Sequence, residues 1–103
     1  MINLIKNMLG MGPKTDFQKL RNEGAVIVDV RSKEEYKQGH IAGSLNIPLD
    51  TLQSNLSLLE DKKSVITCCA SGMRSGMATT ILKKNGNVNV YNGGAWNSLR
   101  SKI

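Results

Sequence analysis

The stretch ITCCASGMRSGM, residues 66–77, determines how the rest of the chain is interpreted. Its apolar, β-branched start is typical of a short buried strand that leads into two adjacent cysteines, Cys68 and Cys69. A turn of small residues follows, and the pattern after the turn is helical. Since open α/β sheets bind their ligands where strands end, this order of elements predicts a ligand-binding turn at the cysteines.

Apolar runs and helical patterns alternate along the rest of the chain. The apolar runs predict strands at residues 25–30, 44–47, 65–68 and 88–91. The helical patterns lie at residues 15–24, 32–39, 49–59, 73–84 and 95–99. Because strands that alternate with helices form parallel sheets, we expect an α/β domain with a mainly parallel central sheet.

Two capping boxes predict where the first two helices begin. In each box a hydroxyl residue is followed three positions later by Gln or Glu, which gives the pairs Thr15–Gln18 and Ser32–Glu35. Such a pair satisfies free amides in the first turn of a helix, so we expect helices to start at these residues.

Apolar residues form two ridges on the predicted helix 73–84. Met73, Met77 and Ile81 lie on one ridge, and Ala78 and Leu82 lie on the other. We expect both ridges to pack against the sheet, with the methionines as core residues rather than as ligands.

The composition indicates one globular domain without a nucleic-acid partner. The chain has 103 residues, a usual size for a single domain. Its net charge is +6, but the basic residues are scattered, and aromatic residues that could stack on bases make up only 4% of the chain. Two adjacent cysteines do not form a disulfide framework, so we expect a reducing compartment, the cytoplasm.

Residues 1–12 are apolar but do not resemble a membrane anchor. Lys6 interrupts the apolar run, which is too short to cross a bilayer and lacks the core of a signal peptide. We therefore expect a short helix or a flexible tail in this segment and no membrane attachment. For the protein as a whole we expect a monomer.

The turn after Cys69 has the composition of an anion-binding loop. Gly72 permits backbone conformations that other residues resist, so successive N–H groups can point inward beside the positive end of the next helix. Arg74 adds a permanent positive charge. In such surroundings Cys69 should be a thiolate at neutral pH, the form that acts as a nucleophile on an anionic substrate.

Three segments of the chain resemble the signatures of single-domain rhodaneses. The loop 69–74 reads C-x-x-G-x-R, residues 29–49 read DVRSKEEYKQGHIAGSLNIPL, and residues 92–99 read NGGAWNSL. The resemblance implies a rhodanese-like three-layer α/β/α domain over residues 13–103. It also implies a sulfurtransferase: Cys69 takes a sulfane sulfur from thiosulfate or a protein persulfide and passes it to cyanide or a thiol. The carrier is a persulfide on Cys69, so the resemblance implies no metal or organic cofactor.

The resemblance also assigns roles to residues around Cys69. The loop that would bind the donor anion consists of Ala70, Ser71, Gly72, Met73, Arg74 and Ser75. We expect the Ser75 hydroxyl to hydrogen-bond Cys69 or the loop. Asp29 and Arg31, at a predicted strand end, are expected to brace the loop. For His40 we expect a structural role in a turn, because a thiolate of low pKa needs no general base.

Cys68, the cysteine before Cys69, is a candidate nucleophile for a different activity. Counted from Cys68, the spacing C-x-x-x-x-x-R-S matches the phosphate-binding signature of cysteine-dependent phosphatases. Two features favour Cys69 instead: Gly72 follows it by three positions, as in rhodanese loops, and Cys68 falls within the apolar strand. Adjacent residues of a strand face opposite sides, so we expect Cys68 to fill the core.

Two further alternatives concern the same doublet. A disulfide between neighbouring residues on an extended strand requires backbone distortion, which argues against a Cys68–Cys69 bridge. A non-catalytic rhodanese-like binding or sensor module is an alternative of another class. Inactive members of this kind usually lack the cysteine, whereas this chain retains Cys69.

Overall fold

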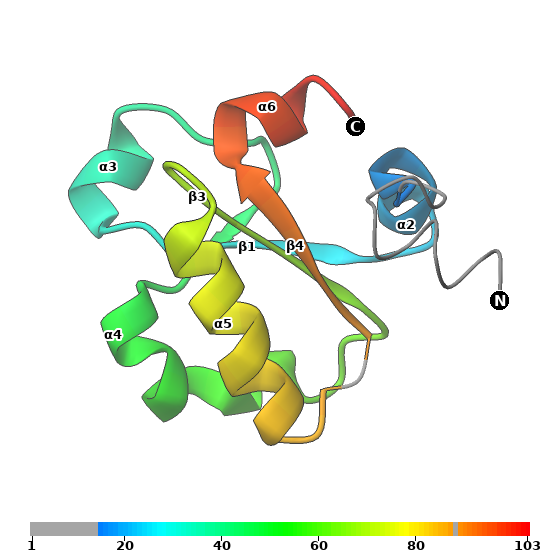
Figure 1. The fold of residues 1–103 in the computed structure, drawn as a ribbon, viewed down its shortest axis with the longest axis vertical. Coiled ribbons are helices and arrows are strands. Elements are labelled where there is room, and N and C mark those ends of the chain that lie inside the picture. Colours follow the sequence, from blue (N-terminus) through cyan, green and yellow to red (C-terminus); the bar gives the residue numbers. More distant parts are fainter. Residues whose placement is uncertain (1–14, 88) are drawn as a thin grey trace, which may run out of the picture.

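Four parallel strands form the centre of the computed structural model, which describes residues 15–87 and 89–103 (Figure 1). The strands are β1 (Val26–Asp29), β2 (Leu45–Asn46), β3 (Val65–Cys69) and β4 (Val90–Ala95). Their order in the sheet is β2-β1-β3-β4, and all three neighbouring pairs run parallel. The predicted parallel sheet is confirmed, while the expectation for residues 1–12 lies outside the described residues.

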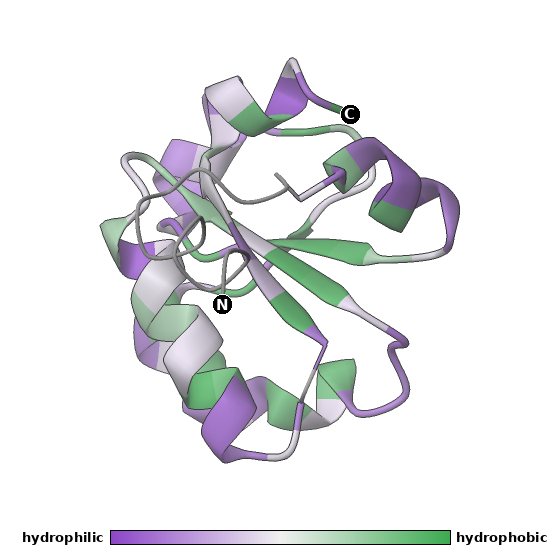
Figure 2. Cartoon of the chain, turned by 45° about the vertical axis from the view of Figure 1, so that its right-hand side comes forward, coloured by the Kyte–Doolittle hydropathy of each residue, from purple (hydrophilic) through white to green (hydrophobic). Residues whose placement is uncertain are grey.

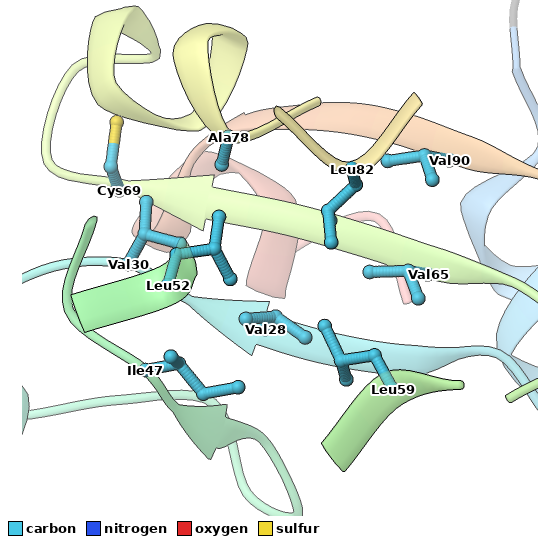
Figure 3. Close-up of a cluster of buried hydrophobic side chains, with 10 residues drawn as sticks. All are labelled: Val28, Val30, Ile47, Leu52, Leu59, Val65, Cys69, Ala78, Leu82 and Val90. Atoms are coloured by element: carbon cyan, nitrogen blue, oxygen red, sulfur yellow. The ribbon is translucent and has the colours of Figure 1, made fainter. Parts of the chain in front are cut away.

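Helices cover both faces of this sheet (Figure 1). They are α2 (Phe17–Asn22), α3 (Lys33–Lys37), α4 (Leu49–Leu52), the 3-10 helix η1 (Gln53–Leu59), α5 (Met73–Lys84) and α6 (Trp96–Arg100). One core cluster joins the sheet to α4, η1 and α5 (Figure 3), and a second cluster joins the other face to α2 and α6. Figure 2 shows hydrophobic residues along the central strands. The α/β/α arrangement predicted from the resemblance is therefore present.

Strand β3 alternates between the two core clusters. Val65 and Cys69 belong to the cluster under α5, whereas Ile66 and Cys68 belong to the cluster on the opposite face. This alternation follows from the two-residue period of a strand, and it confirms that the two cysteines face opposite sides. Both cysteines are free.

Some predicted boundaries are wrong by a few residues. The N-cap of α2 is Asp16 rather than Thr15, and its carboxylate accepts a hydrogen bond of 3.0 Å from the amide of Lys19. A carboxylate caps a helix as well as a hydroxyl does, so Asp16 takes the position predicted for Thr15. The second capping box, Ser32 with Glu35, is confirmed in full. Strand β4 extends to residue 95, beyond the predicted end at residue 91.

The two methionines of α5 are not part of the core, contrary to the prediction, although Ile81 of the same ridge packs against it. Met73 is 72% exposed and Met77 is 53% exposed. The buried residues of this helix are instead Ser75, Ala78 and Leu82, which share a face at helical spacing. The sheet thus contacts a face of α5 that includes a buried serine.

The last strand approaches β3 very closely at Gly93. The pairing of these strands shifts by one residue between Thr67 and Cys69. A Cβ atom on Gly93 would lie 2.7 Å from the carbonyl oxygen of Thr67 and 2.9 Å from Cγ2 of Ile66. Only glycine fits without displacing backbone, and this close contact places β4 beside the end of β3, where Cys69 lies.

Candidate active site

Cys69 occupies the carboxyl end of β3, and its sulfur points toward the start of α5 (Figure 3). The following turn reaches Gly72, whose φ of 103° is left-handed and suits glycine. From this position the Gly72 amide donates a hydrogen bond of 2.9 Å to Cys69 Sγ. The Cys69 side chain has no exposed surface, so the loop encloses the sulfur.

Ser75 connects the sulfur to the last strand. Its hydroxyl lies 3.4 Å from Cys69 Sγ, and its single proton has two acceptors within reach, Asn92 Oδ1 at 2.7 Å and the Gly72 carbonyl at 3.0 Å. Ser75 is fully buried, and Asn92 Oδ1 accepts a second hydrogen bond, from the Gly94 amide at 2.9 Å. These contacts explain why a serine occupies the buried face of α5.

The two cysteines have opposite acid–base properties. Burial raises the pKa of Cys69, but hydrogen bonds from Ser75, Gly72 and the Ser71 amide outweigh it, so the pKa lies below that of an ordinary thiol. Burial raises the pKa of Cys68 to about 12, and the nearby Asp29 carboxylate adds to this increase. Of the two, only Cys69 is prepared to react as a thiolate.

Arg74 forms a bidentate ion pair with Glu35, a residue of α3. The Arg74 Nη1 and Nη2 atoms lie 2.8 and 3.0 Å from the two carboxylate oxygens of Glu35. Glu35 Oε1 also accepts the Ser32 amide at 3.0 Å, as the capping box requires. The hydrogen bond from Arg74 lowers the pKa of Glu35 to about 2, and Glu35 in turn raises the pKa of Arg74.

Asp29 and Arg31 form a buried pair that supports α3. Arg31 Nη2 donates to Asp29 Oδ2 at 2.7 Å and to the Gly39 carbonyl at 2.7 Å, and Nη1 reaches the Glu35 carbonyl at 3.3 Å. The guanidinium also lies 4.6 Å from the ring centre of Trp96. These contacts lead to α3 rather than to the loop, so any support for the loop passes through Glu35.

His40 lies in the turn that follows α3. Its Nδ1 is 2.7 Å from the Tyr36 carbonyl oxygen, and its ring stacks on the Tyr36 ring with centroids 3.7 Å apart. The side chain is thus held by its own turn, the location that the sequence predicted for a structural residue.

Comparison with known proteins establishes the family. The family model for the rhodanese-like domain matches residues 14–98 of this chain. The chain belongs to the rhodanese-like domain family. The human single-domain sulfurtransferase TSTD1 is 29% identical with a TM-score of 0.69, and the match covers 84% of this chain and 91% of the human one.

Curated relatives of this rhodanese-like domain are of similar or greater length. A putative mitochondrial thiosulfate sulfurtransferase of Schizosaccharomyces pombe is 32% identical, and the match covers 85% of this chain and 78% of that protein. The uncharacterized protein YqhL of Bacillus subtilis is 40% identical over 66% of this chain and 54% of its own length. The chain therefore spans about half of YqhL, and it spans 25% of a tRNA uridine(34) hydroxylase from Buchnera aphidicola, which is 36% identical.

The geometry of this rhodanese-like domain argues against the phosphatase alternative. A phosphatase reading requires Cys68 to open the anion-binding loop, but Cys68 is buried in the core cluster on the opposite face of the sheet. Its pKa of about 12 also keeps it protonated. The geometry therefore favours the register that starts the loop at Cys69, with Gly72 three positions later.

A cavity of about 600 Å³ lies beside the site on the side of Arg74. Its walls come from the segments that follow β1 and β2, and its lining residues are Val30, Ser32, Lys33, Pro48, Leu49, Asp50, Thr51 and Arg74. Cys69 is not among them, which agrees with its enclosed sulfur. In the part of the chain that the structure describes, no three acidic, histidine or cysteine side chains gather as a metal site, and no helix could span a bilayer.

Sequence reasoning missed two residues of this rhodanese-like site. The sequence predicts Glu35 only as part of a capping box, and Asn92 only as the first residue of the segment 92–99 that resembles a rhodanese signature. Glu35 lies in the middle of α3 and Asn92 lies within β4, and each directs a side-chain oxygen toward a residue that follows Cys69, Arg74 or Ser75. The signal available in the sequence was their nearness to the predicted strands 25–30 and 88–91, whose carboxyl ends lie at the same edge of a parallel sheet as that of β3.

The acid–base difference between the cysteines predicts selective alkylation. Because only thiolates react, iodoacetamide should modify Cys69 with a rate that rises at lower pH than for free cysteine. Cys68 should remain unmodified while the protein is folded, because its pKa is raised to about 12 and it lies in the core cluster on the face of the sheet opposite the loop, so loop movement does not expose it. Peptide mass spectrometry across a pH series measures both rates, and equal modification of the two residues would contradict the assignment.

Proposed function

We propose that this protein is a sulfurtransferase that carries a sulfane sulfur on Cys69. The observation that supports it most is the environment of the sulfur, which receives the Gly72 amide at 2.9 Å and has a lowered pKa. A thiolate held by hydrogen-bond donors is both available for attack and a good leaving group when the sulfur is passed on.

The proposed reaction consists of two displacements. The Cys69 thiolate attacks the outer sulfur of thiosulfate, a new S–S bond forms, and sulfite departs with the electron pair of the broken S–S bond. Cyanide or a thiolate then attacks the outer sulfur of the persulfide, and the Cys69 thiolate leaves. No electrons are gained or lost overall, so the proposal requires no metal or organic cofactor.

Access to the sulfur requires movement of the loop. Because Cys69 has no exposed surface, a donor can reach Sγ only when the turn between β3 and α5 moves outward. The donor is a small sulfur anion or a protein persulfide, and the S. pombe relative, named a putative thiosulfate sulfurtransferase, supports the former. A reducing compartment such as the cytoplasm would keep Cys69 as a thiolate between turnovers.

The proposal is tested by the intact mass of the protein after incubation with excess thiosulfate. We expect the mass to increase by one sulfur atom, peptide mapping to locate it on Cys69, and a reductant to remove it. The Cys69→Ala variant serves as the control and should gain nothing. A wild-type protein that gains no sulfur would instead favour a non-catalytic rhodanese-like binding module.

A further inference from the structure

The positive charge of Arg74, which follows the Cys69 loop, is paired with the negative charge of Glu35. Both terminal nitrogens of Arg74 contact Glu35, at 2.8 and 3.0 Å, in a fork-to-fork geometry. The side chains are 37% and 36% exposed, so the pair lies where an incoming molecule can meet it. Glu35 belongs to α3, and within the described part of the chain it makes no hydrogen bond with the Cys69 sulfur.

This pairing changes what Arg74 contributes to the site. Arg74 lies in the first turn of α5, directly after the loop that encloses Cys69, and the charge of Cys69 is one of the causes that raise the pKa of Arg74, after the hydrogen bond to Glu35. A free arginine would attract an anion toward the thiolate, whereas an arginine matched by a carboxylate contributes little net field beyond the pair. The remaining attraction for an anion comes from the loop amides and the start of α5.

The approach of a dianion is therefore opposed in this site. Thiosulfate carries two negative charges, and its target is itself a thiolate. A donor of lower charge, such as the persulfide of an uncharged thiol, experiences less repulsion from the same groups. The balance between these donors depends on whether Glu35 neutralises Arg74.

We propose that Glu35 is a specificity-determining residue. By neutralising the charge of Arg74 beside the Cys69 loop, it lowers the preference of the site for dianionic sulfur donors. The inference deepens the proposed function and rests on it, since it concerns the choice of donor. Glu35 touches no reacting atom, and its effect is exerted through the charge of Arg74.

The variant Glu35→Gln separates this role from the structural one. Glutamine fits the same position of a capping box, so its side-chain oxygen can still accept the Ser32 amide while the negative charge is lost. The matched control is Glu34→Gln, which removes the same charge from the same helix at an exposed position. A second variant, Glu35→Gln with Arg74→Gln, removes both charges of the pair.

The first measurement does not depend on sulfur transfer. Iodoacetate and iodoacetamide are of similar size but differ by one negative charge, so the ratio of their reaction rates with Cys69 reports the local field. Loop opening affects both reagents and cancels in the ratio. We expect Glu35→Gln to raise the iodoacetate-to-iodoacetamide ratio about two- to fivefold at low salt, and less at high salt. Glu34→Gln and the double variant should stay near the wild-type ratio.

The second measurement compares sulfur donors. In Glu35→Gln we expect the KM for thiosulfate to fall about two- to fivefold, with little change for the persulfide of 2-mercaptoethanol. An unchanged or lower alkylation ratio in Glu35→Gln would overturn the assignment, because Glu35 would then only anchor Arg74. A wild-type protein that never gains sulfur overturns the proposed function alone, since the alkylation ratio still tests Glu35.

Discussion

Replacing Cys69 by alanine is expected to abolish the formation of thiocyanate from thiosulfate and cyanide, with a loss of at least about a thousandfold. The reason is that both displacements pass through the Cys69 sulfur, and no other described thiol lies on that face of the sheet. The colorimetric assay for thiocyanate measures the effect directly. Circular dichroism should show an unchanged fold, because alanine leaves only a small space under the loop.

The matched control is Cys68→Ala, which changes the neighbouring residue in the same way. We expect it to retain most of the activity and to lower the free energy of unfolding by about 1 kcal/mol, since a small buried group is lost. Equal loss of activity in both variants would contradict the register that starts the loop at Cys69.

Replacing Gly93 by alanine is expected to have the largest effect on stability, lowering the free energy of unfolding by about 3 kcal/mol. The new Cβ would lie 2.7 Å from the Thr67 carbonyl oxygen and 2.8 Å from Cδ2 of Leu99, so β4 would have to separate from β3. The shift would also move Asn92, which accepts the Ser75 hydroxyl, so activity should fall as well. Unfolding in denaturant measures the stability loss.

Gly86→Ala provides the comparison for this effect. Gly86 has a φ of +95°, and a Cβ there would have no neighbour within 4 Å, so alanine would cost only backbone strain of about 1 kcal/mol. Equal costs at residues 86 and 93 would show that the close approach of the strands is not what makes Gly93 necessary.

The sequence predicted the sheet and the orientation of the cysteines because both follow from local periodicity. A buried parallel strand is a continuous apolar run, and its side chains alternate between the faces. The order of Cys68 and Cys69 within β3 was therefore sufficient to place them on opposite faces of the sheet, with Cys69 at the strand end that leads into the loop. The Ser32–Glu35 capping box was predicted for the same reason, since all its contacts lie within four residues.

The contacts that complete the site could not be predicted in this way, because they join distant segments. Arg74 and Glu35 are separated by 39 residues, and Ser75 and Asn92 by 17. The same contacts explain the wrong prediction for Met73 and Met77. Hydropathy favours burying the methionines. The face of α5 that packs against the sheet is instead the one that carries Ser75 and its hydrogen bonds.

The opposite orientation of the two cysteines also bears on how the protein withstands oxidants. A thiolate of lowered pKa is readily oxidised to a sulfenic acid, and a nearby thiol often rescues it by forming a disulfide. Among the residues that the structure describes, Cys69 has no such partner, because the other cysteine there is Cys68, on the opposite face of the sheet. Recovery must come from a thiol in solution before the sulfur is oxidised further and irreversibly, so the working life of each molecule depends on the thiol supply around it.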